Sequence, residues 1–488
     1  MNIKSILEGL QFEVICGNVN IDVNGLSYNT KNAKAGDVFV CIRGYEFDAH
    51  EAMEEIVSLG VRVVVVERTD NICFDAMDIV VIKVKDTKRA LAIMSANLFD
   101  NPQKKLTTIG ITGTSGKTTT AYMIKDILTK LGVKTGLIGT IEVFDGRISK
   151  PSVNTTPASY EILHHMKRMV DNGCRCVVME VSSQALKLDR VYGIRFNYGL
   201  FTNISPDHIG KKEHDTFEEY ISCKMKLVEM SDRVIVNIDD DILRTITMQP
   251  CRCISTVSVE RKADYRACNI EYVKDDKMLG MEYTLCCRRV HIEMSGMFNV
   301  YNSLMALATV NEIMCRSVCA FSKMVNLIAG VKVKGRLQYV NSRSGKGVII
   351  DYAHNGYSME KLLTEIGKYK HNRIIVIFGC GGNRAKDRRY EMGKMAALYS
   401  DVAIITSDNP RWEEPLDIIK DIENGFDKAN TKKTMKIIEP DRFLAIKKAL
   451  SLALEDDLIL LIGKGHEAYQ EIKGKKYPLD EAEMIAIC

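Results

Sequence analysis

The chain has 488 residues, of which 46% are hydrophobic and 27% are charged, the composition of a globular protein. One hydrophobic core does not grow to this length, so we expect about three domains. There are 67 basic and 63 acidic residues, a net charge of +4, and so small an excess argues against nucleic acid or a membrane surface as a partner.

The sequence shows no pattern typical of export or membrane insertion. Its first residues, MNIKSILEGLQFEV, hold no long apolar run and no small-residue cleavage site, so we expect no secretion signal. No stretch of about 18 uncharged apolar residues is present to span a membrane. The 15 cysteines are scattered, and pairs such as Cys174/Cys176 lack the second half of a zinc site. We therefore expect reduced thiols and a cytoplasmic location rather than a disulfide framework.

Residues 1–102 alternate strands and helices. Asn101-Pro102 is typical of a linker. No pairing of a nucleophile with a base is evident, so we assign this block to binding. The apolar pattern predicts a strand over 37–42, a helix over 50–59, a buried strand over 61–67 and a helix over 87–99.

The stretch 106–120, LTTIGITGTSGKTTT, predicts a phosphate-binding loop. A buried strand around Ile109 runs into a glycine turn, and helical spacing of apolar residues continues from Ala121. Glycines let backbone N–H groups face an anion, and a helix N-terminus adds partial positive charge. Lys117 is placed to reach the outer phosphates, and the Thr118 hydroxyl is placed to ligate Mg²⁺.

The loop spacing differs from the common pattern G-x-x-x-x-G-K-[ST], which would put glycine where Ile111 stands. An ordinary strand-to-helix turn is the alternative. We predict a site for a nucleoside triphosphate made by Gly113, Thr114, Ser115, Gly116, Lys117, Thr118 and Thr119.

Polar residues follow two later strands of the same block. Glu180 ends the apolar run 176–181, and His208 follows the run 200–204. Ligands bind at the carboxyl ends of parallel strands, so Glu180 is well placed for Mg²⁺ and His208 could join it. The structural alternatives are an acid at a strand end without a ligand and a lone structural histidine. A helix over 213–230 carries Lys224, which by itself predicts only a solvated lysine.

From residue 333 onward the pattern predicts a third α/β unit. Several buried strands each deliver a polar loop to one sheet edge, which predicts a second ligand site there. The loops are DYAH (351–354), GCGGNR (379–384), SDNPR (407–411) and GKGHE (463–467).

Taken in order, these motifs resemble the Mur ligases over nearly the whole chain. The resemblance is strongest to the family members that add a diamino acid to a UDP-linked muramoyl dipeptide. It rests on SYNTKNAKAGDVFVCIRG (27–44), GTSGKTT (113–119), NTTP (154–157), EVSS (180–183), NISPDH (203–208), GMFNVYN (296–302), KGR (334–336) and the four loops named above.

The resemblance implies an α/β protein of three domains that bind UDP-sugar, ATP and amino acid respectively. It places a smaller N-terminal α/β domain at 1–102, a central P-loop ATPase-like domain with a parallel sheet at 103–332, and a C-terminal Rossmann-like domain at 333–488. It also implies a monomer that makes a peptidoglycan precursor through an acyl phosphate, with the third domain closing over the second to exclude water.

The resemblance also assigns roles to single residues. Thr118, Glu180 and His208 would hold Mg²⁺, together with Lys224 in a carbamylated form. Lys117, Glu180, His208 and Lys224 would be the catalytic residues. The nucleotide would also meet Asn299, Arg336 and Asp351, the UDP-sugar peptide would meet Thr30, Thr155, Thr156, Ser182 and Arg190, and the amino acid would meet Arg389, Asp408, Asn409, Pro410, Arg411, Gly463 and Glu467.

The DNPR motif favours meso-diaminopimelate as the amino acid over L-lysine. Diaminopimelate carries a carboxylate at its far end, which the planar fork of Arg411 can grip through two hydrogen bonds. The structural alternative is that Arg411 pairs with Glu413 or Glu414 nearby. Departures from the family pattern at Ala158, Gln184, Met297, 355–358 and Trp412 keep L-lysine, another diamino acid, or a diverged second copy of the ligase open as alternatives.

Three other functions are weaker alternatives. Folylpolyglutamate synthase shares the ATP chemistry but not the N-terminal block or SDNPR. A P-loop transport or regulatory ATPase finds no support in residues 1–100 or 334–488. A silent homologue that only binds ligands is at odds with intact Lys117, Glu180, His208 and Lys224.

Overall fold

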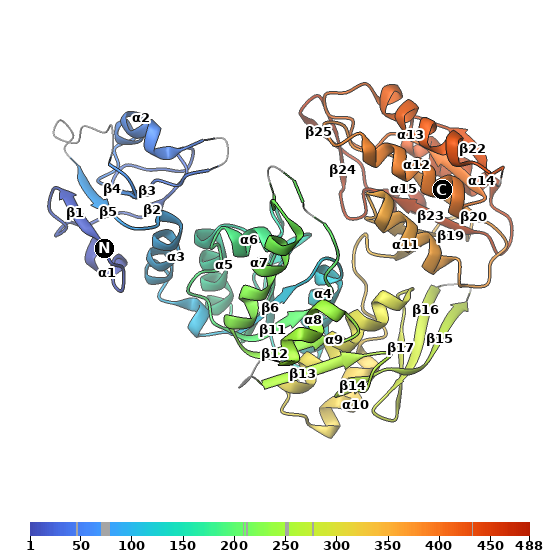
Figure 1. Cartoon of the computed structure of the whole chain (residues 1–488), viewed down its shortest axis with the longest axis horizontal. Helices are drawn as coiled ribbons and strands as arrows, with labels where there is room; N and C mark the ends of the chain where they lie inside the picture. Colours follow the sequence, from blue (N-terminus) through green and yellow to red (C-terminus); the bar gives the residue numbers. More distant parts are fainter. Residues whose placement is uncertain are drawn as a thin grey trace. The chain divides into compact units, whose positions relative to one another are not determined.

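The computed structural model describes residues 1–44, 47–69, 79–207, 209–210, 213–248, 253–275, 278–431 and 433–488. Its contacts divide the chain into one unit of residues 1–265 with 305–317 and a second unit of residues 266–304 with 318–488. Both are α/β, which confirms the predicted class (Figure 1). Within the described residues, no helix has the length and apolar character that a membrane span requires.

The N-terminal block is a five-stranded sheet in the order β1-β5-β4-β3-β2, with β1 antiparallel to its neighbour. Valines 63–66 of β4 alternate between two cores, one under α1 and α3 and one under α2. The predicted helix over 50–59 is a 3₁₀ turn followed by a short α-helix. The bounds are α1 Ile3–Ile6, β1 Glu13–Cys16, β2 Leu26–Ser27, β3 Val38–Val40, η1 Ala49–Ala52, α2 Met53–Ser58, β4 Val63–Val66, β5 Val80–Lys83, α3 Thr87–Leu98 and η2 Pro102–Lys104.

The central sheet has nine strands in the order β14-β13-β12-β11-β6-β10-β7-β8-β9. Strand β6 lies between β10 and β11 and runs parallel to both, so the loops that follow these three strands meet at one edge. The strands are β6 Thr107–Thr112, β7 Thr135–Ile138, β8 Glu142–Phe144, β9 Ser149–Pro151, β10 Cys176–Glu180, β11 Phe196–Phe201, β12 Ser231–Asn237, β13 Cys253–Ser258 and β14 Tyr265–Arg266, and the helices are α4 Lys117–Lys130, α5 Ser159–Asp171, α6 Ser183–Lys187, α7 Phe217–Glu229, α8 Asp241–Arg244 and η3 Thr245–Met248.

The second unit contains a small antiparallel sheet and a larger, mostly parallel one. The first has the order β15-β16-β17, and both neighbouring pairs are antiparallel. Its elements are β15 Cys268–Asp275, β16 Met278–Leu285 and β17 Arg288–Ile292, followed by α9 Met297–Ile313, which crosses into the first unit, and α10 Val318–Leu327.

The larger sheet has the order β18-β19-β23-β20-β21-β22, with only β18 antiparallel. Four of its parallel strands end in the four predicted polar loops. The bounds are β18 Gln338–Asn341, β19 Gly347–Asp351, α11 Gly356–Ile366, β20 Ile374–Phe378, α12 Asp387–Tyr399, β21 Val402–Ile405, α13 Pro415–Ala429, β22 Met435–Ile438, α14 Arg442–Leu452, β23 Leu458–Ile462, the hairpin β24 Tyr469–Ile472 with β25 Lys475–Pro478, and α15 Glu481–Ala486.

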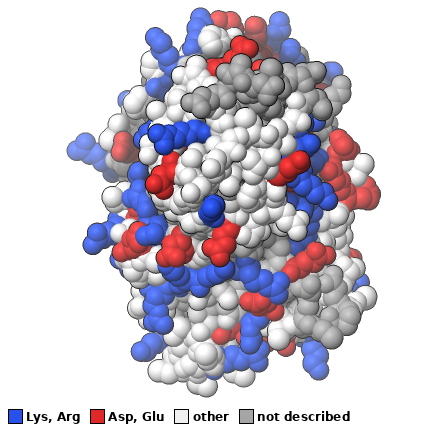
Figure 2. All heavy atoms as spheres, turned by 90° about the vertical axis from the view of Figure 1, so that its left-hand side faces the viewer, with Lys and Arg blue, Asp and Glu red and all other residues white. Residues whose placement is uncertain are grey.

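The surface charge agrees with the composition. On the face drawn in Figure 2, basic and acidic side chains are intermixed, as expected for a net charge of only +4.

Candidate active site

The glycine loop between β6 and α4 requires glycine for both conformation and space. Gly113 has φ 145° and Gly116 has φ 86°, in the region that favours glycine. A Cβ on Gly113 would overlap the Thr202 hydroxyl. Gly116 is the N-cap of α4 and makes no side-chain cap, which leaves the first-turn N–H groups available to an anion. The loop is therefore suited to phosphate groups.

The end of β11 holds this loop in place. The backbone N–H of Thr114 donates to the Asn203 carbonyl at 2.8 Å, and that of Ser115 donates to Asn203 Oδ1 at 2.9 Å. The Thr202 hydroxyl donates to the Ser115 carbonyl at 2.7 Å. No role was predicted for Thr202 or Asn203, although both follow a parallel strand whose carboxyl end lies at the predicted site.

Lys117 and Lys224 meet at one carbonyl of the loop. Each Nζ donates to the Gly113 oxygen at 2.8 Å. Lys224 is only 2% exposed, and its Nζ lies 4.6 Å from the centre of the Tyr220 ring. Burial, and next the positive charge of Lys117, lower the pKa of Lys224 well below its ordinary value. Lys224 is thus a buried amine with a weakened hold on its proton, not a solvated lysine.

Glu180 and Thr118 are brought together as predicted. Glu180 is 1% exposed at the end of β10, and its Oε2 accepts from the Thr118 hydroxyl at 2.9 Å. The other carboxylate contacts come from Thr140, whose N–H and hydroxyl donate at 2.8 and 3.0 Å. A hydroxyl beside a carboxylate is an oxygen donor set that fits Mg²⁺. His208, the remaining predicted ligand, lies outside the described residues.

We expect Gly139→Ala to impair this site. A Cβ at Gly139 would lie 2.5 Å from Glu180 Oε1, so the carboxylate must shift from the position in which it accepts from Thr118 and Thr140. Misplacing a catalytic group by about 1 Å costs up to roughly 100-fold in rate, and steady-state ADP release at several Mg²⁺ concentrations would measure the loss. Gly330→Ala is the control, because a Cβ there meets no atom within 4 Å. An unchanged rate for Gly139→Ala would mean that this carboxylate position does not matter.

The residues expected to meet the UDP-sugar peptide adjoin Glu180. The Thr156 hydroxyl donates to the Glu180 carbonyl at 2.8 Å and accepts from the Ser182 N–H at 3.0 Å. Arg190 donates to the Thr156 carbonyl at 2.8 Å. The Thr155 hydroxyl lies 3.1 Å from the Thr140 hydroxyl, within hydrogen-bond distance. These four predicted residues therefore form one network with the Mg²⁺ candidates.

Thr30 is linked to this network less directly. Two residues before it, the Tyr28 hydroxyl donates to Glu161 Oε1 on α5 at 2.7 Å. Burial raises the pKa of Glu161, and the nearby Arg190 opposes the shift. The segment that carries Thr30 is thus joined to the helix beside Arg190.

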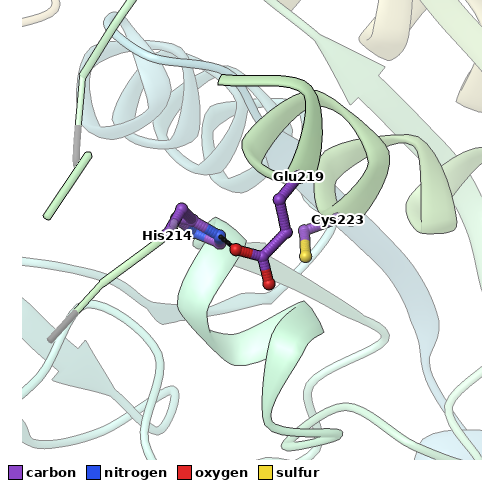
Figure 3. A group of neighbouring side chains, drawn as sticks. All are labelled: His214, Glu219 and Cys223. Carbon is purple, nitrogen blue, oxygen red and sulfur yellow. Dashed lines mark ion pairs between the residues drawn. The ribbon is translucent and has the colours of Figure 1, made fainter. Parts of the chain in front are cut away.

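His214, Glu219 and Cys223 form a cluster at the start of α7 (Figure 3). His214 Nε2 lies 2.9 Å from the Ser183 hydroxyl, and its Nδ1 lies 3.8 Å from Glu219. Glu219 also accepts from Lys187 Nζ at 2.8 Å, as well as from a backbone N–H. Burial raises the pKa of the Cys223 thiol, which opposes metal binding. We interpret the cluster as a structural support. Through the contact of His214 with Ser183, it fixes α7, and with it Lys224, beside the segment that follows β10.

Several residues of the second unit that were predicted to bind the amino-acid substrate lie around a buried lysine. Lys464 Nζ is fully buried and donates to Asn409 Oδ1 at 2.9 Å, with Asp408 at 3.8 Å and Glu467 at 3.6 Å. Asn409 in turn donates to Glu467 Oε2 at 2.8 Å. A Cβ on Gly463 would lie 2.8 Å from Asp408 Oδ2. Lys464 lies within the motif GKGHE, but no role was predicted for it.

The side chains of Arg411 and Arg389 differ in their exposure and in their partners. Arg411 donates to the Gly382 carbonyl at 2.7 Å and to Glu471 at 3.2 Å, rather than pairing with Glu413 or Glu414. Arg389 is 1% exposed and donates to Glu413 and Asp421. Pro410 precedes Arg411, whose φ is 52°. Arg389 therefore has a structural role as a buried ion-pair partner, whereas the Arg411 side chain remains partly accessible to a ligand.

Asn299, Arg336 and Asp351, predicted to meet the nucleotide, belong to the second unit. The Asn299 amide donates to the Ser295 carbonyl at 2.8 Å. Arg336 stacks over Tyr352 with its Cζ 4.8 Å from the ring centre. Asp351 accepts two backbone N–H groups at 2.9 Å, and burial raises its pKa.

Three Mur ligase domains match the chain. The catalytic domain of the Mur ligase family matches residues 22–98, the Mur ligase middle domain matches 111–310, and the Mur ligase glutamate ligase domain matches 335–465.

Two curated relatives are named UDP-N-acetylmuramoyl-L-alanyl-D-glutamate–2,6-diaminopimelate ligase. The protein of Clostridium perfringens is 41% identical, with 99% of both chains covered, and that of Clostridium tetani is 38% identical, with 99% of this chain and 98% of the relative covered. A solved structure of a ligase with the same name covers 99% of this chain and 98% of its own at TM-score 0.68, and at 23% identity it supports the fold alone. The chain belongs to the Mur ligase family of ATP-dependent ligases that form amide bonds.

Proposed function

We propose that the protein adds meso-2,6-diaminopimelate to UDP-N-acetylmuramoyl-L-alanyl-D-glutamate, with ATP and Mg²⁺, in the synthesis of a peptidoglycan precursor. Relatives named for this reaction match 99% of the chain. The observation that carries the choice of amino acid is the partly open guanidinium of Arg411, which follows Asp408 and Asn409 in the same loop. L-lysine, which has no carboxylate at its far end, would leave the N–H donors of Arg411 that do not meet Gly382 or Glu471 without a substrate partner.

The three substrates would occupy three groups of residues. We propose domains at 1–102, 103–332 and 333–488, each of which contains one of the three family matches. Thr30, Thr155, Thr156, Ser182 and Arg190 would bind the UDP-linked dipeptide, residues 113–119 with Asn299, Arg336 and Asp351 would bind ATP, and Arg389, Asp408, Asn409, Pro410, Arg411, Gly463 and Glu467 would form the amino-acid pocket.

The reaction would begin with transfer of the γ-phosphoryl group to the D-glutamyl carboxylate, giving an acyl phosphate and ADP. Lys117 would leave the Gly113 carbonyl and stabilise the negative charge on the transferred group. Bound Mg²⁺ would supply further charge neutralisation, with Thr118, Glu180 and His208 as its candidate ligands. The free amine of diaminopimelate would then attack the acyl carbon, and phosphate would leave.

Lys224 would serve this site as a carbamate. An uncharged lysine amine adds to CO₂ and releases a proton, which replaces a cation with a carboxylate-like anion. The buried position and lowered pKa of Lys224 favour the uncharged amine that this addition needs. The anion would lie beside Gly113, where it could hold Mg²⁺ or orient Lys117.

The proposed function is tested by ADP release and by the mass of the product. We expect ADP release only when ATP, the UDP-linked dipeptide and a diamino acid are all present, with diaminopimelate joined in the product. ADP release without the UDP-linked dipeptide would instead indicate an ATPase of another class. We further propose a monomeric, cytoplasmic enzyme. Size-exclusion chromatography with light scattering would test the oligomeric state.

A further inference from the structure

Thr140 holds both oxygens of the Glu180 carboxylate, although no motif indicated it. Strand β7 ends two residues before Thr140 and runs parallel to β10, with Ile138 opposite Met179, so Thr140 and Glu180 lie at the carboxyl ends of neighbouring strands. The Thr140 N–H donates to Oε1 at 2.8 Å, and its hydroxyl donates to Oε2 at 3.0 Å. These two bonds from one residue fix the orientation of the carboxylate.

The hydroxyl of Thr140 also lies 3.1 Å from the hydroxyl of Thr155, and the number of protons decides which of the two donates. A hydroxyl has a single proton, whereas an ionised carboxylate can only accept. A hydrogen bond to a charged acceptor is roughly twice as strong as a neutral one, so the Thr140 proton goes to Glu180. Thr155 therefore donates to Thr140, and Thr140 donates to Glu180, which together we call the hydroxyl chain.

The hydroxyl chain joins residues to which the proposed function gives different ligands. Glu180 is a candidate ligand of Mg²⁺ together with Thr118, whose hydroxyl donates to Oε2 at 2.9 Å. Thr155, at the other end, is a candidate contact of the UDP-linked dipeptide. Thr155 and Thr140 are both partly exposed, so a ligand can reach this end of the chain. Thr140 is thus the residue through which a change at Thr155 reaches Glu180.

We propose that Thr140 is a positioning residue that couples binding of the UDP-linked dipeptide to binding of Mg²⁺. This inference rests on the proposed function. A dipeptide that contacts Thr155 orders the hydroxyl chain, so the Glu180 carboxylate loses less conformational entropy when it then binds the metal. Such coupling is reciprocal, so Mg²⁺ tightens the binding of the dipeptide by the same factor.

The test measures binding rather than turnover. The UDP-linked dipeptide is titrated by calorimetry into the full-length protein at one fixed ADP concentration, first with Mg²⁺ and then with EDTA. The dissociation constant in EDTA divided by that in Mg²⁺ gives the coupling ratio. Thr140→Val removes the hydroxyl but keeps the N–H and the shape, and Thr140→Ser keeps the hydroxyl. Thr129→Val is the matched control, because Thr129 is exposed on α4 and its hydroxyl donates to the Lys125 carbonyl of the same helix.

We expect Thr140→Val to lower the coupling ratio about fivefold from the wild-type value, the low end of the usual coupling between two sites. Thr140→Ser and Thr129→Val should keep the wild-type ratio. Thr155→Val should lower the ratio as much as Thr140→Val does. The double variant should lower it no further, because both residues belong to the same chain of contacts.

A wild-type coupling ratio in Thr140→Val would overturn the inference. An equal loss of affinity in Mg²⁺ and in EDTA would also overturn it, because Thr140 would then only support the local structure. If the wild-type protein binds the dipeptide equally well in both conditions, the inference fails and the proposed function stands. If the wild-type protein does not bind the UDP-linked dipeptide at all, the proposed function fails as well.

Discussion

Replacing Lys224 by methionine is expected to lower ADP release with all substrates present by roughly 100- to 1,000-fold, the scale of losing one group that stabilises charge in a transition state. Methionine fills a similar volume but cannot form a carbamate or donate to the Gly113 carbonyl. Lys224→Glu should recover part of the activity, because it restores a negative charge at the same position on α7.

The thermal stability of the Lys224→Met variant distinguishes a loss of catalysis from misfolding. A buried lysine whose pKa is lowered binds its proton less well in the folded than in the unfolded chain, so below its unfolded pKa it costs folding free energy. Lys224→Met should therefore unfold at the wild-type temperature or above it while losing activity. Lys226 lies two residues further along the same helix at an exposed position. Lys226→Ala should therefore keep both the wild-type unfolding temperature and the wild-type activity. Near-normal turnover of Lys224→Met would remove Lys224 from the site.

Arg411→Ala is expected to abolish most of the preference for diaminopimelate over L-lysine. Truncating one partner of a close charge pair costs roughly 2–5 kcal/mol, or about 30- to several-thousand-fold. The loss should appear mainly in the KM for diaminopimelate, because the contact proposed for Arg411 is with the far end of the substrate rather than with the reacting amine. The variant also leaves Glu471 without its cation, which would favour the ammonium of lysine.

The ratio of kcat/KM for the two amino acids measures this change. Arg388→Ala is the control, because Arg388 is exposed on the helix that carries Arg389. If Arg411→Ala kept the wild-type ratio while the control behaved normally, the guanidinium would have no part in the choice of amino acid.

The sheet edges and their polar loops were predictable because strands and glycine turns have strong local patterns. The contact of Thr118 with Glu180 follows from two parallel neighbouring strands that end in polar residues. The burial of Lys224 was not predictable from the helical pattern, since the position differs from that of exposed Lys226 only in what packs against it.

The contact between Glu471 and Arg411 could not be predicted from local sequence patterns. Glu471 lies on a two-stranded hairpin outside the parallel sheet, and its contact with Arg411 joins residues 60 positions apart. No periodicity in 469–478 indicates that partner. The burial of Lys464 was equally unpredictable. A lysine between two glycines is typical of a solvated turn, but here its side chain is fully buried among acidic and amide oxygens.

The most direct test of the proposed function is competition between meso-diaminopimelate and L-lysine for the wild-type protein, with ATP, Mg²⁺ and the UDP-linked dipeptide supplied. Mass spectrometry of the product gives the ratio of the two amino acids joined. From the Arg411 geometry we expect diaminopimelate to exceed lysine by about 30-fold or more at equal concentrations. Equal incorporation of the two amino acids would contradict this account.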